Sequence, residues 1–330
     1  MLFNGQIIYF FAHEAYVLSP EQISKGYADE DVSFFQPLSS ASNLRVLAII
    51  SIVTGLLFGL AVFLKYSSSF QKIGQLIDRS TKFAPDLIRI VFGASLIFSA
   101  NHNALFGPEL PLDLFPGAEI LRVLLYLSGA ALIAGAYIKW FGWLSVLIYA
   151  YAFVFKGAYL LTYANYFGEA LAVILLPRQH FSLDHARAKW RAKKTETSLS
   201  KYSMPVARIF LGLSLLYSAI SVKILHPSLS MDVAVNYELS KFFHLDPSMI
   251  VLGAALTEIL IAFLYILGFL QKVTSIIFVI FMTLPILYFK ESVWPHYLLF
   301  GLAIGIFMHK PDFLALDSKS IKKLHKKKFS

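Results

Sequence analysis

Residues 205–226, PVARIFLGLSLLYSAISVKILH, form an apolar run that is long enough to span a membrane as a helix. The run nevertheless carries two positive charges, Arg208 near one end and Lys223 near the other. A charge inside a spanning helix costs roughly 3 kcal/mol unless it is paired or reaches the membrane surface. Each of the two charges therefore needs a partner or a role.

The composition is that of a membrane protein. Hydrophobic residues make up 57% of the 330 residues and charged residues only 15%, whereas about 25% of the residues in a soluble globular chain are charged. The net charge of +9 comes from short segments beside helix ends, which is typical of membrane topology and argues against nucleic-acid binding. The chain has no cysteine, which excludes disulfides, thiol redox chemistry and iron–sulfur clusters.

The hydrophobic pattern predicts an all-α polytopic membrane protein with about nine transmembrane helices. A first helix at residues 44–64 precedes two units of four helices each, at residues 85–177 and 204–309. The nine predicted spans are residues 44–64, 86–106, 118–138, 141–161, 163–176, 205–225, 248–270, 273–289 and 295–308.

The charges of the connecting segments predict the orientation of the chain. The linkers at residues 65–84 and 178–203 and the tail at residues 310–330 are basic, which places them in the cytoplasm. The N-terminal segment 1–43 and the hairpin 107–117 are acidic and are expected outside. The sequence therefore predicts a multi-pass protein of the cell membrane with an extracytoplasmic N-terminus and a cytoplasmic C-terminus.

The two units resemble each other in their first two helices. In the first helix, Arg89 and Gly93 correspond to Arg208 and Gly212, and in the second, Glu119 and Gly129 correspond to Glu258 and Gly268. Polar residues in register on two successive helices indicate an internal duplication. Because each unit has an even number of helices, the two copies are expected to run parallel.

The most informative residue of the second unit is Glu258. It lies ten positions into its helix, which places it about 15 Å deep and near the bilayer midplane. Lys223 on the preceding antiparallel helix is the expected partner. Either the two residues form a buried ion pair that sets helix register, or they belong to a polar intramembrane pocket together with His296 and His226.

The first unit contains counterparts of these candidate pocket residues, namely His102, Glu119, Lys156 and Glu169. Arg89 and Arg208 lie near the inner ends of their helices and are expected to anchor in lipid headgroups. The histidines lack the i, i+4 spacing of a helical metal motif, and none is expected to face another inside the bundle. Neither a metal site nor a haem is therefore predicted.

The second unit resembles the DoxX family of four-helix membrane proteins. The resemblance rests on Arg208-Ile-x-x-Gly212, Ser218 and Lys223, followed by Glu258-Ile-Leu and Leu267-Gly268 on the next helix. The first unit looks like a divergent copy, with Ala104 or its neighbours in place of the lysine unless Lys156 substitutes. The resemblance implies a four-helix bundle and an association with quinone-linked enzymes, since the family is named for a membrane subunit of such enzymes.

The sequence leaves three functions open, and none of them specifies a reaction. The first is a membrane subunit or partner in quinone-linked redox chemistry, with a quinone as the candidate ligand and a redox protein or a second copy of the chain as the partner. The second is a small-solute transporter, which internal repeats and midplane charges would suit. The third is a non-catalytic structural subunit of a membrane complex.

Overall fold

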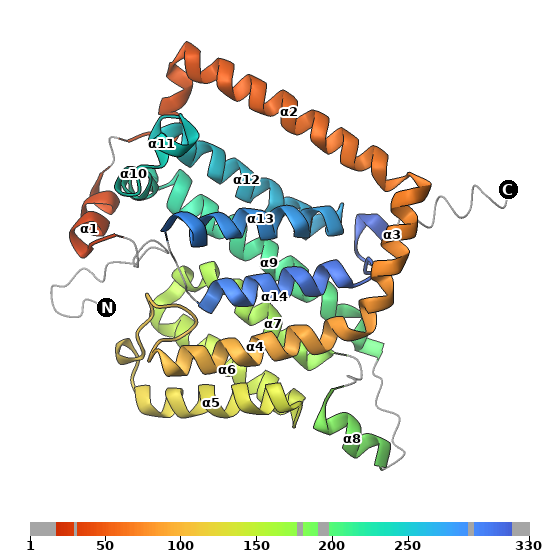
Figure 1. The fold of residues 1–330 in the computed structure, drawn as a ribbon. Helices are drawn as coiled ribbons and strands as arrows, with labels where there is room; N and C mark the ends of the chain where they lie inside the picture. Colours follow the sequence, from red (N-terminus) through yellow and green to blue (C-terminus); the bar gives the residue numbers. More distant parts are fainter. Residues whose placement is uncertain (1–17, 30–31, 177–180, 191–197, 290–293, 319–330) are drawn as a thin grey trace.

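A computed structural model describes residues 18–29, 32–176, 181–190, 198–289 and 294–318, and every regular element in these residues is a helix (Figure 1). Five helices there are long and apolar enough to cross a membrane, and further apolar helices are shorter, such as Trp294–Met308. The prediction of an all-α polytopic membrane protein is therefore confirmed. The predicted tail beyond residue 318 and the first 17 residues lie outside the described part.

Each of the nine predicted spans contains a helix. Residues Ile138–Leu175 are helical without a break. The two halves of this stretch nevertheless pack against each other, so the chain reverses in the 3-10 turn Gly157–Tyr163. The helices are α2 (Ala41–Lys65), then α4 (Ala84–Asn101), α5 (Ala118–Ala134), α6 (Ile138–Lys156) and α7 (Ala164–Leu175), then α9 (Ser203–Ser218), α12 (Pro247–Leu267), α13 (Gln271–Phe289) and α14 (Trp294–Met308).

Short helices occupy segments that the sequence analysis treated as linkers or loops. At one end of the bundle, α1 packs on α10, where Gly26 lies directly against the Leu229 side chain (Figure 1). At the opposite end, α3 runs across the ends of the spanning helices. The short helices are α1 (Pro20–Ala28), α3 (Ser68–Asp78), α8 (Leu183–Trp190), α10 (Pro227–Asn236) and α11 (Leu239–Phe243).

The two arginines predicted to anchor in lipid are buried instead. Arg89 is 0% exposed, and its Nη1 donates to the carbonyls of Leu132 and Ile133 at the C-terminal end of α5. Arg208 is 1% exposed and donates in the same way to two carbonyls, those of Tyr265 and Ile266, at the end of α12. A helix C-terminus presents unpaired carbonyls and a partial negative charge, and a guanidinium group satisfies both.

This observation corrects the lipid-anchoring expectation for Arg89 and Arg208, because neither guanidinium reaches a headgroup. Each also has a carboxylate partner: Asp86 lies 3.2 Å from Arg89 and Asp312 lies 3.0 Å from Arg208. We call the arginine, its carboxylate and the two carbonyls of the neighbouring helix an arginine clasp. The clasps connect the first two helices of each unit at one end of the bundle.

A second pair of aspartates completes the same end of each unit. Asp184 accepts hydrogen bonds from the first amides of α6, those of Tyr137 and Ile138, both at 3.0 Å. Asp317 accepts from the corresponding amides of α13, those of Leu270 and Gln271, also at 3.0 Å. These carboxylates satisfy the unpaired donors of a helix N-terminus.

The contacts align α5 with α12, the second helix of each unit, differently from the alignment predicted from the sequence. A constant offset of 133 residues relates the clasp carbonyls, the capping aspartates and the left-handed helix-terminal glycines Gly135 (φ 67°) and Gly268 (φ 64°). Glycine adopts this backbone conformation without steric cost. With this offset Gly268 aligns with Gly135, and Glu258 aligns with Leu125, whereas the sequence pattern aligned Glu258 with Glu119 and Gly268 with Gly129.

The two units contact each other reciprocally. Gly168 of α7 packs directly against the Phe210 side chain of α9, and Gly301 of α14 packs directly against the Val91 side chain of α4. The first helix of each unit thus pairs with the fourth helix of the other. Reciprocal contacts of this kind, α4 with α14 and α9 with α7, are those that a two-fold arrangement of two similar units produces.

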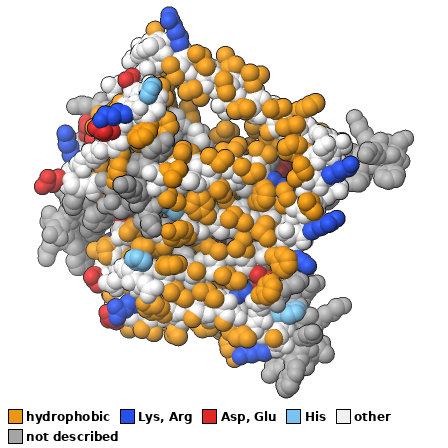
Figure 2. All heavy atoms as spheres, viewed as in Figure 1, with side chains coloured by type: hydrophobic (Ala, Val, Ile, Leu, Met, Phe, Trp, Pro, Cys, Tyr) orange, Lys and Arg blue, Asp and Glu red, His pale blue; other side chains and the backbone are white. Residues whose placement is uncertain are grey.

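The surface agrees with a membrane environment. Apolar side chains cover the middle of the face seen in Figure 2, and charged side chains gather at its two edges. Exposed apolar residues are expected where helices meet lipid instead of water.

We predict that Arg208→Ala strongly destabilises the protein, because it leaves Asp312 and two helix-terminal carbonyls buried without their partner. Breaking a buried pair on one side costs about 3–5 kcal/mol. The control is Arg122→Ala at the exposed Arg122–Glu119 pair, whose side chains are 41% and 75% exposed and whose loss should cost less than about 1 kcal/mol. Thermal unfolding in nanodiscs measures both variants, and equal losses would contradict the structural role of the clasp.

Candidate functional site

A cavity of about 470 Å³ lies where the second unit meets α7 of the first, beneath α10 and α11. Its walls are mainly apolar, with a few polar side chains that come from both units. The polar lining includes Tyr163 from the 3-10 turn before α7, Asn165 and Tyr166 from α7, and Ser214, Lys223, Glu258 and His296 from the second unit. Volume and lining fall within the range of small-molecule sites in proteins.

The predicted contact between Lys223 and Glu258 is present in the structure. Lys223 Nζ lies 3.0 Å from Glu258 Oε2, and the two side chains are 15% and 13% exposed. Both residues line the cavity, so the ion pair is in reach of a bound molecule. The position of the pair is therefore compatible with both alternatives: an ion pair that fixes the register between two helices, and part of a polar pocket.

The helix that carries Lys223 changes form at this point. Residues Ala219–Ile224 form a π-helical segment that continues α9, and the Leu225 amide donates to the Ile220 carbonyl over 3.0 Å. π-Helical turns inside α-helices are frequent at functional sites because the extra residue redirects side chains. Across the cavity, Pro285 lies inside α13 and removes one backbone hydrogen bond there.

The two candidate histidines of the second unit lie in different places. His296 is 2% exposed and lines the cavity at the start of α14. His226 is not among the lining residues; its ring packs edge-on against Tyr27 of α1, with the ring centroids 4.6 Å apart. Burial lowers the pKa of His226, which favours the neutral ring at neutral pH. His226 therefore joins α1 to the second unit and is not part of the cavity.

The four candidates of the first unit do not form a second pocket. His102 stacks on Trp294 with centroids 4.4 Å apart, Glu119 is exposed and pairs with Arg122, and Lys156 lies over the Phe115 ring. Glu169 is 1% exposed, and neither of its carboxyl oxygens has a hydrogen-bond partner in the described part of the chain. The structure thus separates residues that the sequence grouped together.

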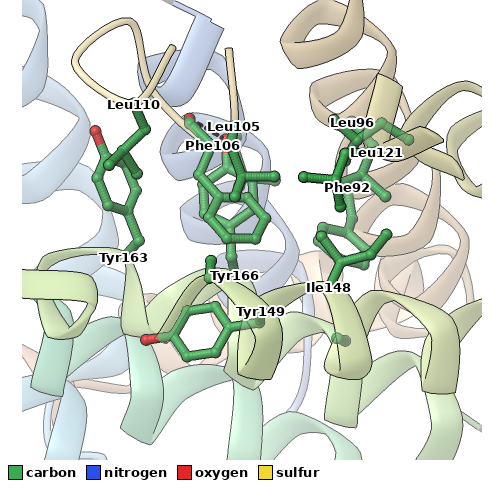
Figure 3. Packing of buried hydrophobic residues seen from close by; sticks show 14 of the residues in the cluster. Phe92, Leu96, Leu105, Phe106, Leu110, Leu121, Ile148, Tyr149, Tyr163 and Tyr166 are labelled. Atoms are coloured by element: carbon green, nitrogen blue, oxygen red, sulfur yellow. Dashed lines mark hydrogen bonds between the residues drawn. The ribbon is translucent and has the colours of Figure 1, made fainter. Parts of the chain in front are cut away.

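The core of the first unit is packed with apolar and aromatic side chains. Leu125 stands at the position of Glu258, and the hairpin after α4 inserts Leu105, Phe106 and Leu110 into the core. Figure 3 shows the Phe106 ring close to Tyr149 and Tyr166. The centroid of the Phe106 ring lies 5.7 Å from that of Tyr149 and 4.6 Å from that of Tyr166. A polar pair in the second unit is therefore replaced by close apolar packing in the first.

Part of the hairpin 107–117, which the sequence predicts outside the membrane, is packed into the protein. Leu110 and Leu112 are 1% and 0% exposed, and Glu109 is 5% exposed. Glu109 accepts hydrogen bonds from Tyr159 and Tyr163. A charged residue in a loop is usually solvated, so nothing in the sequence indicates that Glu109 is buried.

The contribution of α7 to the cavity was not predicted from the sequence. Tyr163, Asn165 and Tyr166 line it from the first unit, and Ser214 of the second unit hydrogen bonds to the Thr162 carbonyl and to Asn165 Oδ1. The cluster of polar and aromatic residues near the start of this short helix was a usable signal. Only the packing of α7 on α9 reveals which cavity these residues face.

The cavity offers donors and acceptors at one place in an apolar wall. The ammonium group of Lys223 donates, the carboxylate of Glu258 accepts, and the hydroxyls of the lining tyrosines and serines can do either. Among the described residues no group of three histidine or carboxylate side chains could hold a metal ion. The arrangement suits a mostly apolar molecule with one oxygen-bearing end.

We predict that replacing only one member of the Lys223–Glu258 pair is more destabilising than replacing both. Lys223→Met and Glu258→Leu each leave one charge without its partner, whereas the double variant leaves none. A double-mutant cycle on thermal unfolding should give a coupling energy of about 0.5–3 kcal/mol. Additive effects of the two substitutions would mean that the ion pair contributes nothing to stability.

Comparison with known proteins agrees with the geometry of the second unit. The DoxX family model matches residues 203–291, which contain α9, the π-helical segment with Lys223, and α12 with Glu258. No curated protein and no solved structure matches the chain. The similarity to the DoxX family thus covers residues 203–291, the part of the chain that carries Lys223 and Glu258.

Proposed function

We propose that the cavity binds the ring of a quinone or a chemically similar amphiphile, and that the protein is a membrane subunit or partner in quinone-linked redox chemistry. The observation that carries the proposal is the Lys223–Glu258 ion pair in the wall of an otherwise apolar cavity. A quinone ring is flat and apolar with oxygen atoms at its edge, so it needs both kinds of surface.

The lining residues have separate roles in this proposal. Lys223 donates to a ring carbonyl oxygen, and Glu258 accepts from the hydroxyl of the reduced ring. The side chains of Tyr163 and Tyr166 contact the ring, and Tyr166 is held by a 2.6 Å hydrogen bond between its hydroxyl and that of Ser95. In this proposal a redox partner protein supplies or takes up the electrons.

The arrangement of the chain belongs to the same proposal. The units at residues 85–177 and 204–309 are a tandem duplication in parallel orientation, supported by the repeated arginine clasp and by the reciprocal contacts of α7 and α14. The N-terminal segment lies outside the cell membrane and the basic linkers and tail lie in the cytoplasm. On this orientation the cavity lies in the outer half of the membrane.

A second function is favoured by one observation. Both the π-helical segment with Lys223 and Pro285 inside α13 interrupt regular helix where they line the cavity. Interrupted helices at a midplane site are typical of transporters. Solute flux into proteoliposomes that is lost in Lys223→Met would favour a small-solute transporter over a redox subunit.

We predict that Glu258→Gln weakens binding of a ubiquinone analogue by about tenfold or more. Loss of a hydrogen bond to a charged group costs about 1.5–3 kcal/mol, and 1.4 kcal/mol corresponds to a factor of ten in affinity. Titration of the purified protein in nanodiscs measures the dissociation constant. Glu119→Gln is the matched control, because this exposed carboxylate lies outside the cavity and its loss should leave the affinity unchanged.

Two outcomes would count against the proposal. Equal affinity for the wild type and Glu258→Gln, with both proteins folded, would remove the ion pair from the binding site. Absence of quinone binding by the wild type would reject the quinone itself and leave the transporter or a structural subunit.

A further inference from the structure

The middle of α2 is separated from the bundle. Every residue from 48 to 60 is exposed, whereas residues near both ends of the helix are partly buried. At one end Asn43 hydrogen bonds to Asp246 over 3.4 Å, and at the other Lys65 pairs with Asp317 at 2.6 Å. Figure 1 shows α2 as an outlying helix beside α12 and α13. The helix is therefore fastened at its ends, and between them it approaches the bundle through single side chains such as Phe58, whose ring centroid lies 6.0 Å from that of Phe269.

The cavity extends to this open side. Ile50 of α2 lines the cavity and is also 46% exposed. Opposite it, Gly253 of α12 lines the cavity and is exposed, and a Cβ atom added at Gly253 would meet nothing within 4 Å. Surface that belongs both to the cavity and to the exterior marks an opening between α2 and α12.

The side chains around this opening are apolar. On α12, Leu256 and Leu260 are 44% and 41% exposed, and on α2, Leu56 and Leu57 are 69% and 61% exposed. In a membrane protein such surface lies in the hydrocarbon layer. The opening therefore leads into lipid, and a water-soluble solute would have to cross hydrocarbon to use it.

The end of the cavity nearest the polar side chains is covered. Ser230 and Val233 of α10 and Leu239 of α11 line it there, and all three are buried. Phe243 at the end of α11 also lines the cavity and is 41% exposed. The ion pair Lys223–Glu258 thus lies beneath a helical cover on one side, while the apolar opening lies on another.

From this geometry we infer that the ligand enters sideways from the bilayer between α2 and α12. Its polar end reaches Lys223 and Glu258, and its hydrocarbon chain stays between the two helices. This inference rests on the proposed function, which identifies the ring of the ligand as a quinone. It adds that the ligand is a lipid with at least one long hydrocarbon chain. A short-chain analogue has the same polar contacts but lacks those with the opening.

The first test measures the opening without any ligand. Because the chain has no cysteine, Gly253→Cys provides a single site for a spin label, whose collisions with oxygen and with a water-soluble nickel chelate are then compared in nanodiscs. We expect high oxygen and low chelate accessibility, as at the control Val154→Cys on the exposed face of α6, which is 80% exposed. Chelate accessibility like that at Lys241→Cys, an exposed site on α11, would overturn the lateral opening.

The second test blocks the opening. Gly253→Trp should slow uptake of a long-chain ubiquinone by about tenfold, which corresponds to about 1.4 kcal/mol in the barrier, and should slow uptake of a short-chain analogue much less. The control is Gly59→Trp. A side chain at Gly59 also has open space around it, but it lies on the opposite face of α2 from Ile50, about 180° around the helix axis.

The two proposals can fail separately. Unchanged long-chain uptake in Gly253→Trp overturns the entry route even if quinones bind. If neither analogue binds the wild type, the quinone proposal fails, and the spin-label result still decides whether the opening faces lipid.

Discussion

The requirement that a charge in hydrocarbon must have partners governs this structure. Arg89 and Arg208 satisfy it by donating to the C-terminal carbonyls of a neighbouring helix and by pairing with Asp86 and Asp312. Each clasp fixes how far two antiparallel helices slide along each other, because a shift of one residue would move the carbonyls away from the guanidinium. The rest of each unit is assembled on this end of the bundle.

The same framework supports two different interiors. In the first unit, Phe106 and its neighbours fill the space between the helices, and Leu125 stands where the second unit has Glu258. In the second unit, the corresponding space is a cavity with the Lys223–Glu258 pair in its wall. Close packing favours stability in one unit, whereas the other keeps a polar pair and an empty volume, both of which cost stability. That contrast is the reason to look for a ligand in the second unit alone.

The candidate site was predictable where a single local rule decided it. Glu258 deep in a spanning helix had to find a cation, and Lys223 was the nearest one on the preceding helix. The prediction for Arg208 was wrong because it used a local rule, that an arginine near a helix end usually reaches the lipid headgroups. No local pattern in the sequence reveals that a neighbouring helix ends beside Arg208. The contribution of Tyr163 and Tyr166 was also hidden, since it depends on α7 of one unit packing against α9 of the other.

The sequence by itself determined the membrane class, the position of each apolar helix and the contact between Lys223 and Glu258, because hydrophobic length and the cost of a buried charge act along short stretches of chain. Only the tertiary structure decided the register between the two units, the burial of the arginines, the filled core around Phe106 and the open side of the cavity at α2. These features depend on which surfaces meet across more than a hundred residues, and apolar helices of similar composition allow many such pairings until side-chain packing selects one.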